Sequence, residues 1–224
     1  MAFIRPFQPQ DTEDCKHICR ATLPASLASS PPAIRMAPYL WTLQFTHLSP
    51  QTCFVLDDGT GRVVGYVIGV PDVFAFADAY PRYVDEVLRG AQGVIDVPPP
   101  AQLETVEPAP SSSGEPNVLS MAQQAYKIEW LVLDGVEGKK ELVGEYRAMM
   151  HIDLLEEAQG QGWGRKMIER FVGSVRSSGL DFGRGVQIGV SGENTKVVPF
   201  YERVGFRVYP GGEKEGCVWM VLDL

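Results

Sequence analysis

The sequence has little positive charge and no long apolar run. It carries 20 lysine and arginine residues against 28 acidic residues, which gives a formal net charge of −8 over 224 residues. An acidic chain repels phosphate backbones and anionic lipid, so we expect no nucleic acid and no membrane partner. No run approaches the ~18 apolar residues of a transmembrane helix, and residues 1–7 lack the apolar core of a secretory signal. These absences favour a cytoplasmic protein.

Cysteine and histidine are also scarce. None of the three histidines stands at zinc-ligand spacing, and no Cys-x-x-Cys pair is present. We therefore expect no metal, and we expect reduced thiols at Cys15, Cys19, Cys53 and Cys217. A Walker A loop is missing as well, which excludes the commonest nucleotide-binding loop.

The apolar residues that are present alternate in the pattern of an α/β protein. Strands are predicted over residues 3–7, 52–56, 62–70, 148–155, 186–190, 206–209 and 217–222. Helices are predicted over 12–22 with Asp11 or Thr12 as the cap, and over 39–48, 73–88, 118–132, 139–146 and 194–204. A further helix is predicted around the apolar positions 167–175 and ends at residues 177–179. Residues 29–32 are expected to form a loop and residues 210–212 a turn.

The composition changes between the third and fourth of these strands. Six prolines and three consecutive serines fall between residues 98 and 116, which predicts a flexible Pro/Ser-rich loop at 96–117. We predict a single domain over 1–224 with an insertion at 72–147.

A glycine-rich turn follows the strand at 148–155 and precedes an amphipathic helix. The turn reads Gln159-Gly160-Gln161-Gly162-Trp163-Gly164. Glycine lets a ligand approach the backbone, and the free N–H groups and dipole of a helix N-terminus attract anions such as pyrophosphate. A dinucleotide fingerprint requires Gly-x-Gly-x-x-Gly early in the chain, so that alternative fits poorly.

The turn resembles the acyl-CoA motif of the GNAT N-acetyltransferases, Gln/Arg-x-x-Gly-x-Gly/Ala. Residues 194–206 resemble a second family segment, Asn-x-x-Ala-x-x-Phe-Tyr-x-x-x-Gly-Phe, with Val197 replacing the alanine. Residues 4–11 resemble a typical GNAT start. Residues 151–155 are similar to the branch that includes the acetyltransferase-like domain attached to O-GlcNAc hydrolase. The resemblance covers most of the chain outside 72–147, although Glu156 and Pro199 depart from the usual pattern.

This resemblance implies a fold and a reaction. The fold would be α/β, a mixed and mostly antiparallel sheet of about six or seven strands, with helices on both faces and splayed central strands. The reaction would be direct attack by an amine acceptor on acetyl-CoA in a ternary complex, in a monomer or homodimer. The residues expected around CoA are Leu154, Leu155, Gln159, Gly160, Gln161, Gly162, Trp163, Gly164, Arg165, Asn194 and Tyr201. A non-catalytic binding module and transfer of another acyl group stay open as alternatives.

Three residues are candidates for the chemistry. The resemblance assigns protonation of the leaving thiolate to Tyr201. His151 and Asp153 are two apart on a strand and face the same side, so either can serve as the base or contact the acceptor. A structural ion pair would explain Asp153 equally well. Among the CoA residues, Arg165 can instead be a solvated charge, Asn194 a helix cap, and Trp163 a packing residue against the insertion. A backbone N–H near Leu154 or Leu155 would polarise the thioester carbonyl.

Overall fold

The computed structural model describes residues 1–102, 116–214 and 216–224. Its centre is one seven-stranded sheet in the order β1-β2-β3-β4-β5-β7-β6. All neighbouring strands pair antiparallel except β4 and β5, which run parallel. The strands are β1 Phe3–Pro6, β2 Phe54–Asp57, β3 Val63–Val70, β4 Ala148–Leu154, β5 Gly185–Ser191, β6 Arg207–Lys214 and β7 Cys217–Asp223. The predicted mixed, mostly antiparallel sheet is confirmed.

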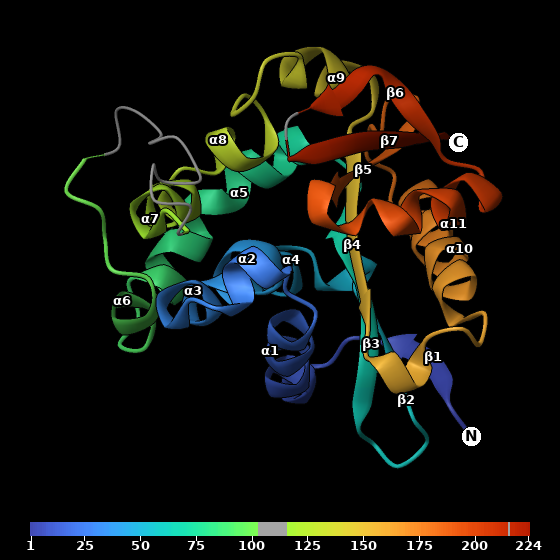
Figure 1. Cartoon of the computed structure of the whole chain (residues 1–224), viewed down its shortest axis with the longest axis horizontal. Coiled ribbons are helices and arrows are strands. Elements are labelled where there is room, and N and C mark those ends of the chain that lie inside the picture. The colour runs from blue at the N-terminus through green and yellow to red at the C-terminus, as the bar shows by residue number, and fades with distance from the viewer. Residues whose placement is uncertain (103–115, 215) are drawn as a thin grey trace.

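Helices cover both faces of this sheet (Figure 1). Helices α10 and α11 lie on one side, whereas α1 to α8 lie on the other. The longer helices are α1 Thr12–Ala21, α3 Pro31–Trp41, α4 Leu43–Leu48, α5 Val73–Tyr83, α7 Val118–Tyr126, α9 Lys139–Glu145, α10 Trp163–Arg176 and α11 Val198–Arg203. The shorter ones are α2 Ala25–Ala28, α6 Gly93–Asp96 and α8 Ile128–Val132. They are joined by the 3₁₀ segments η1 Pro9–Asp11, η2 Pro50–Thr52, η4 Glu156–Ala158 and η5 Gly192–Val197, and by the π-helical segment η3 Val84–Leu88.

Helix α10 anchors the glycine turn to the core. Its apolar stripe, Met167, Ile168, Phe171 and Val175, is buried, and burying side chains of this size stabilises the fold by roughly 1.5–3 kcal/mol each. Gly69 in β3 makes this packing possible, because a Cβ there would lie 2.9 Å from the Phe171 ring. The N-terminus of α10 is therefore held at a fixed place beside the end of β4.

A buried ion-pair network fixes the first strand. The Arg5 guanidinium bonds Asp11 at 2.7 Å and Asp57 at 3.0 Å, and the two carboxylate side chains are only 3% and 5% exposed. Asp11 precedes α1 as predicted, but its side chain does not cap that helix. It accepts instead from Arg5 and from the Gln8 N–H at 2.8 Å.

Several predicted boundaries were wrong. Residues 31–32 begin α3 rather than lying in a loop, because Ser30 caps the helix and proline is well tolerated in a first turn. The helix predicted over 39–48 is divided between α3 and α4, and the one over 118–132 between α7 and α8. Residues 210–212 lie within β6, where a register shift between Val208 and Glu213 absorbs the glycines.

The chain between β3 and β4 contains α5 to α9, while the two strands themselves are direct neighbours. Treating residues 72–147 as an insertion in a single domain stays a prediction. The predicted flexible loop at 96–117 falls mostly on residues 103–115, which lie outside the described residues. Among the described helices, none has the length and apolar character needed to cross a membrane.

Candidate active site

The parallel strands β4 and β5 open away from each other. They pair only at Ala148 with Val186 and at Met149 with Gln187, although each strand is seven residues long. Beyond those pairs, β4 continues along β3 and β5 continues along β7. The predicted splay of the central strands is thus present, and the edges of β4 and β5 border an opening.

Backbone groups of β4 face this opening in alternation. The Leu155 N–H donates to the Val64 carbonyl of β3 at 2.9 Å. In an antiparallel ladder successive residues point their N–H groups to opposite sides, so the Leu154 N–H faces the opening. The sequence offered the N–H group of Leu154 or of Leu155 as the oxyanion donor. The N–H of Leu155 is already bonded, so the candidate donor is the N–H of Leu154.

The glycine turn lies at the end of the opening where β4 ends. Gly160 and Gly162 have φ of 72° and 80°, and a Cβ built on either would meet no atom within 4 Å. In the described part of the chain, the N–H groups of residues 160–162 have no acceptor. The 14-residue helix α10 begins at Trp163 and adds its dipole. Free donors, positive potential and open space together fit a pyrophosphate.

Side chains of the motif hold the turn in shape. The Gln159 amide donates to the Leu154 carbonyl at 2.9 Å, and the Gln161 amide donates to the Glu157 carbonyl at 2.6 Å. The exposed Arg165 guanidinium donates to the Arg203 carbonyl at the end of α11, at 3.0 Å. The side chains of Gln159, Gln161 and Arg165 therefore bond backbone carbonyls of the protein itself.

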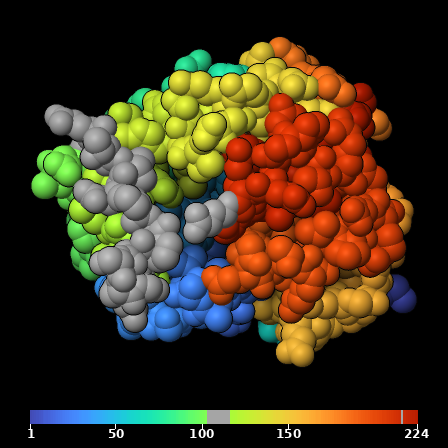
Figure 2. All heavy atoms as spheres, turned by 45° about the horizontal axis from the view of Figure 1, so that its top comes forward, coloured from blue at the N-terminus to red at the C-terminus, as the bar shows by residue number. Residues whose placement is uncertain are grey.

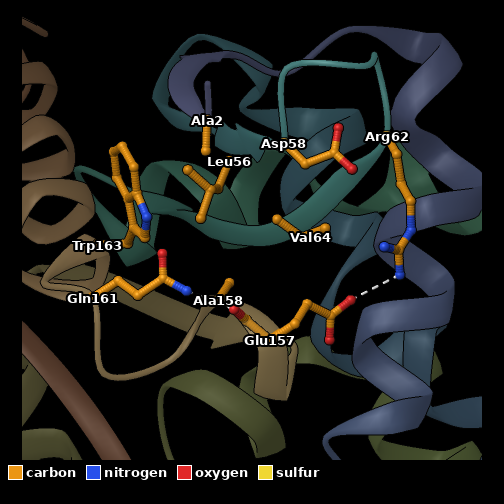
Figure 3. Close-up of a pocket in the computed structure, with 9 residues that line it drawn as sticks. All are labelled: Ala2, Leu56, Asp58, Arg62, Val64, Glu157, Ala158, Gln161 and Trp163. Atoms are coloured by element: carbon orange, nitrogen blue, oxygen red, sulfur yellow. Dashed lines mark hydrogen bonds and ion pairs between the residues drawn. The ribbon is translucent and has the colours of Figure 1, made fainter.

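Trp163 points away from the predicted insertion. Its indole borders a hollow of about 180 Å³, together with Ala2, Leu56 and Ala158 (Figure 3), and Lys166 Nζ lies 4.4 Å from its ring. The prediction that Trp163 packs against residues 72–147 was wrong. The hollow is smaller than the roughly 300–1,000 Å³ of typical ligand pockets, so we assign Trp163 a packing role.

The two sequence motifs meet at Gly164. A Cβ at this position would lie 2.9 Å from the Phe200 ring, so only glycine lets α10 approach α11 this closely. Tyr201 follows directly, and its ring lies 5.6 Å from that of Phe206. Burial and the charge of Asp153 raise the pKa of Tyr201, which keeps the phenol protonated. The charge of Asp153, which lies on β4, therefore acts on the Tyr201 phenol.

A polar cluster lies on β3 and β4 beside the opening. Asp153 accepts from the Tyr66 hydroxyl at 2.6 Å and pairs with His151 Nε2 at 3.0 Å. Burial lowers the pKa of His151, but the charge of Asp153 and the hydrogen bond to it outweigh burial, so the pKa is raised. Burial raises the pKa of Asp153, but His151 and the hydrogen bonds reaching the carboxylate outweigh it, so the pKa is lowered. The side chains of His151 and Asp153 are 38% and 20% exposed, so an acceptor can reach both.

Two contacts here were not predicted from the sequence. Tyr66 stands in an apolar strand, where a phenol is the one polar group, and it lies opposite Asp153 in the β3–β4 register. Glu193 accepts from the Ser26 hydroxyl, and from the Ser26 N–H at 3.3 Å. This second contact joins α2 to η5 across 167 residues of sequence, and no local pattern signals it.

Asn194 does not act as a helix cap. Ser191 caps η5, and Asn194 lies at a kink with φ −122° and ψ 28°. Pro199 falls in the first turn of α11, which begins at Val198, one of the two positions that the sequence allowed. Asn194 is exposed, with no hydrogen bond assigned to its side chain among the described residues. A ligand contact therefore stays a prediction for this residue.

A hollow lies on the side of the sheet that faces the N-terminal helices. Figure 2 shows it between the blue N-terminal helices, the yellow-green region of α7 and α8, and the red β6–β7 hairpin. His151 and Asp153 lie on the side of the N-terminal helices, because Asp153 accepts from the Tyr66 hydroxyl, which lies 3.4 Å from Oγ1 of Thr42 between α3 and α4.

This sheet order, with its splayed central pair and glycine turn before α10, is the fold of the GNAT N-acetyltransferases. The solved structure of SsHAT has a TM-score of 0.75 at 25% identity, covering 99% of this chain and 98% of that one. PaiA N-acetyltransferase from Thermoplasma acidophilum, solved with coenzyme A, has a TM-score of 0.54 at 10% identity, covering 100% and 99%. The GNAT domain of S. lividans PAT has a TM-score of 0.50 at 13% identity, covering 100% and 90%.

No protein-family profile matches the chain. The solved structures of this fold include N-acetyltransferases. The narrower likeness of residues 151–155 to the O-GlcNAc hydrolase branch stays a prediction.

Proposed function

We propose that this protein is an N-acetyltransferase that moves an acetyl group from acetyl-CoA to an amine acceptor. The observation that carries this proposal is the opening between β4 and β5. One end of it meets the free N–H groups of the glycine turn, and its edge presents the Leu154 N–H. Asp153 and Tyr201 lie close enough for the carboxylate charge to perturb the phenol. The groups proposed to bind acetyl-CoA and the groups proposed to act on the amine thus lie at the same opening.

On the donor side, acetyl-CoA supplies a thioester whose carbonyl carbon is the electrophile. The N–H groups of residues 160–164 hold its pyrophosphate, with the dipole of α10 adding positive potential. Arg165 can assist if its side chain leaves the Arg203 carbonyl. Leu154 donates its N–H to the carbonyl oxygen, where negative charge develops during attack. Asn194 contributes a polar contact to CoA.

On the acceptor side, an amine of ordinary pKa near ~10.4 arrives protonated and must lose a proton before it can attack. His151 in its neutral form accepts that proton. Asp153 stabilises the resulting imidazolium at 3.0 Å and is itself held by Tyr66 at 2.6 Å. The raised pKa of His151 makes it a stronger base than a free imidazole.

Tyr201 serves the leaving thiolate. Its raised pKa makes the phenol a weaker acid than usual, so it remains protonated and donates a hydrogen bond to the sulfur as charge develops. The proton released by the amine then completes the thiol by way of Tyr201 or solvent. An edge-to-face contact with Phe206 packs the Tyr201 ring in place.

The test is release of CoA thiol in the presence of acetyl-CoA and a panel of amines. Turnover that depends on both His151 and Tyr201 supports the proposal. CoA binding without transfer to any amine would instead point to a binding module, and preference for a longer thioester would point to another acyl group.

A further inference from the structure

Two lysines converge on one tryptophan on the acceptor side of the sheet. Lys139 Nζ and Lys214 Nζ each lie 5.4 Å from the centre of the Trp219 ring. Lys139 begins α9, whereas Lys214 ends β6, so elements far apart in the sequence bring these charges together. The chain as a whole carries an excess of eight negative charges. A paired positive site is therefore unexpected on composition alone.

The donors of these lysines are largely unused. Lys139 Nζ donates to Gln187 Oε1 at 2.8 Å, and Gln187 is fixed because its amide donates to the Tyr146 carbonyl at 2.7 Å. An ammonium has three donors, and toward the described residues Lys139 uses one of them and Lys214 uses none. No described carboxylate forms an ion pair with either lysine, whereas the neighbouring Lys140 pairs with Asp134. Burial lowers the pKa of Lys139 to about 8, as expected for a desolvated cation without a counter-ion.

The strand register places this pair on the same face as the catalytic candidates. Met149 pairs with Gln187 across β4 and β5, and Gly189 pairs with Trp219 across β5 and β7. Paired residues point to the same face and alternate residues repeat it, so Gln187 and Trp219 share the face of His151 and Asp153. The end of the red β6–β7 hairpin lies beside the hollow in Figure 2.

We propose that Lys139 and Lys214, lying against Trp219, bind an oxyanion carried by the acceptor, so that the substrate is an amine linked to a carboxylate or phosphate. This inference rests on the proposed function, because it specifies the acceptor of that same site. The free donors of the two ammonium groups supply charge-assisted hydrogen bonds to the oxyanion, while the buried Trp219 ring fixes where the two ammonium groups lie.

The register also sets the length of the linker. A strand rises about 3.3 Å per residue, so His151 lies roughly 7 Å and Asp153 roughly 13 Å along β4 from Met149, the partner of Gln187. Trp219 itself pairs with Gly189, two residues beyond Gln187, and lies on β7, with β5 between it and β4. We therefore expect an amine at the base and an oxyanion at the lysines to be separated by several bonds, which an α-amine and its own α-carboxylate do not span.

The experiment compares aminoalkanoates, from glycine to aminooctanoate, with alkylamines of equal length. We expect the carboxylate to raise kcat/KM by roughly 10- to 100-fold for aminohexanoate or aminooctanoate, and not for glycine. Lys139→Gln and Lys214→Gln should each remove this advantage through KM and leave alkylamine turnover unchanged. Lys140→Gln is the matched control, because Lys140 is exposed and paired with Asp134 at 2.7 Å. An aminohexyl phosphate distinguishes phosphate from carboxylate.

The outcomes separate the two proposals. Efficient acetylation of alkylamines with no gain from a carboxylate would overturn the oxyanion site and leave the proposed function intact. If no amine is acetylated, calorimetry with N-acetylaminooctanoate tests the site directly. Binding that weakens at least tenfold in the Lys139→Gln, Lys214→Gln double variant supports it, and absent or unchanged binding refutes it.

Discussion

The glycine turn can be tested with a matched pair of substitutions. Gly162 and Gly179 have nearly the same backbone conformation, with φ of 80° and 72°, and a Cβ at either would meet no protein atom within 4 Å. Gly162 precedes α10 at the opening, whereas Gly179 follows the other end of that helix. Valine at either position thus imposes similar backbone strain, but only at Gly162 does the new side chain enter the space proposed for the pyrophosphate.

The expected magnitudes follow from this geometry. A non-glycine residue in the left-handed region costs roughly 1–2 kcal/mol. In a chain of this size, the melting temperature falls by about 2–4 °C per kcal/mol, so both variants should melt roughly 2–8 °C lower. Loss of two charge-assisted hydrogen bonds at roughly 1.5–3 kcal/mol each would weaken CoA binding in Gly162→Val by about 100-fold or more.

Isothermal titration with CoA and thermal unfolding provide the two readouts. Gly179→Val should show the loss in melting temperature and keep the wild-type Kd for CoA. Equal CoA affinity in the two variants, at equal folded fraction, would refute the assignment of pyrophosphate to this turn. A selective loss at Gly162 cannot be ascribed to backbone strain, because the strain is common to both.

Three further predictions concern the catalytic residues and the stability of the first strand. Tyr201→Phe should lower kcat by roughly 100-fold, the usual effect of losing an acid catalyst, while CoA titration gives an unchanged Kd. In the wild type, kcat/KM should rise with pH through the raised pKa of His151, because only the neutral imidazole accepts a proton. A pH profile of His151→Gln should lack that rise, and an unchanged rise would contradict the assignment. Arg5→Ala should lower the free energy of unfolding in urea by about 3 kcal/mol, since it leaves the buried Asp11 carboxylate without its partner; a loss under 1 kcal/mol would contradict this.

The features that could be predicted from sequence are those with a local cause. The run at Gly160–Gly164 signals a turn because positive φ and close approach both require glycine, and two such glycines do adopt positive φ. The stripe of Met167 and Phe171 signals a helix face because its spacing matches 3.6 residues per turn. Each of these signals is complete within about fifteen residues.

The features that were missed depend on pairings between distant segments. Tyr66 reaches Asp153 only through the β3–β4 register, and a strand pattern does not specify its partner strand. The bond between Ser26 and Glu193 requires α2 and η5 to meet, which only the tertiary fold brings about. Residues 210–212 carry the composition of a turn, but a bulge on an edge strand uses the same residues. Turn chemistry alone cannot distinguish those two outcomes.

The opening between β4 and β5 follows from the topology of the sheet. Helix α10 connects these strands, and it supplies the crossover that a parallel pair needs. Each strand also has an antiparallel partner on its other side, β3 for β4 and β7 for β5, so both are held while they diverge. The Leu154 N–H is then left facing the gap, and unpaired backbone groups in an interior are costly unless a ligand or water bonds them. The peptide-like arm of CoA can satisfy such groups. The divergence of the one parallel pair therefore leaves backbone groups that the proposed substrate can bond.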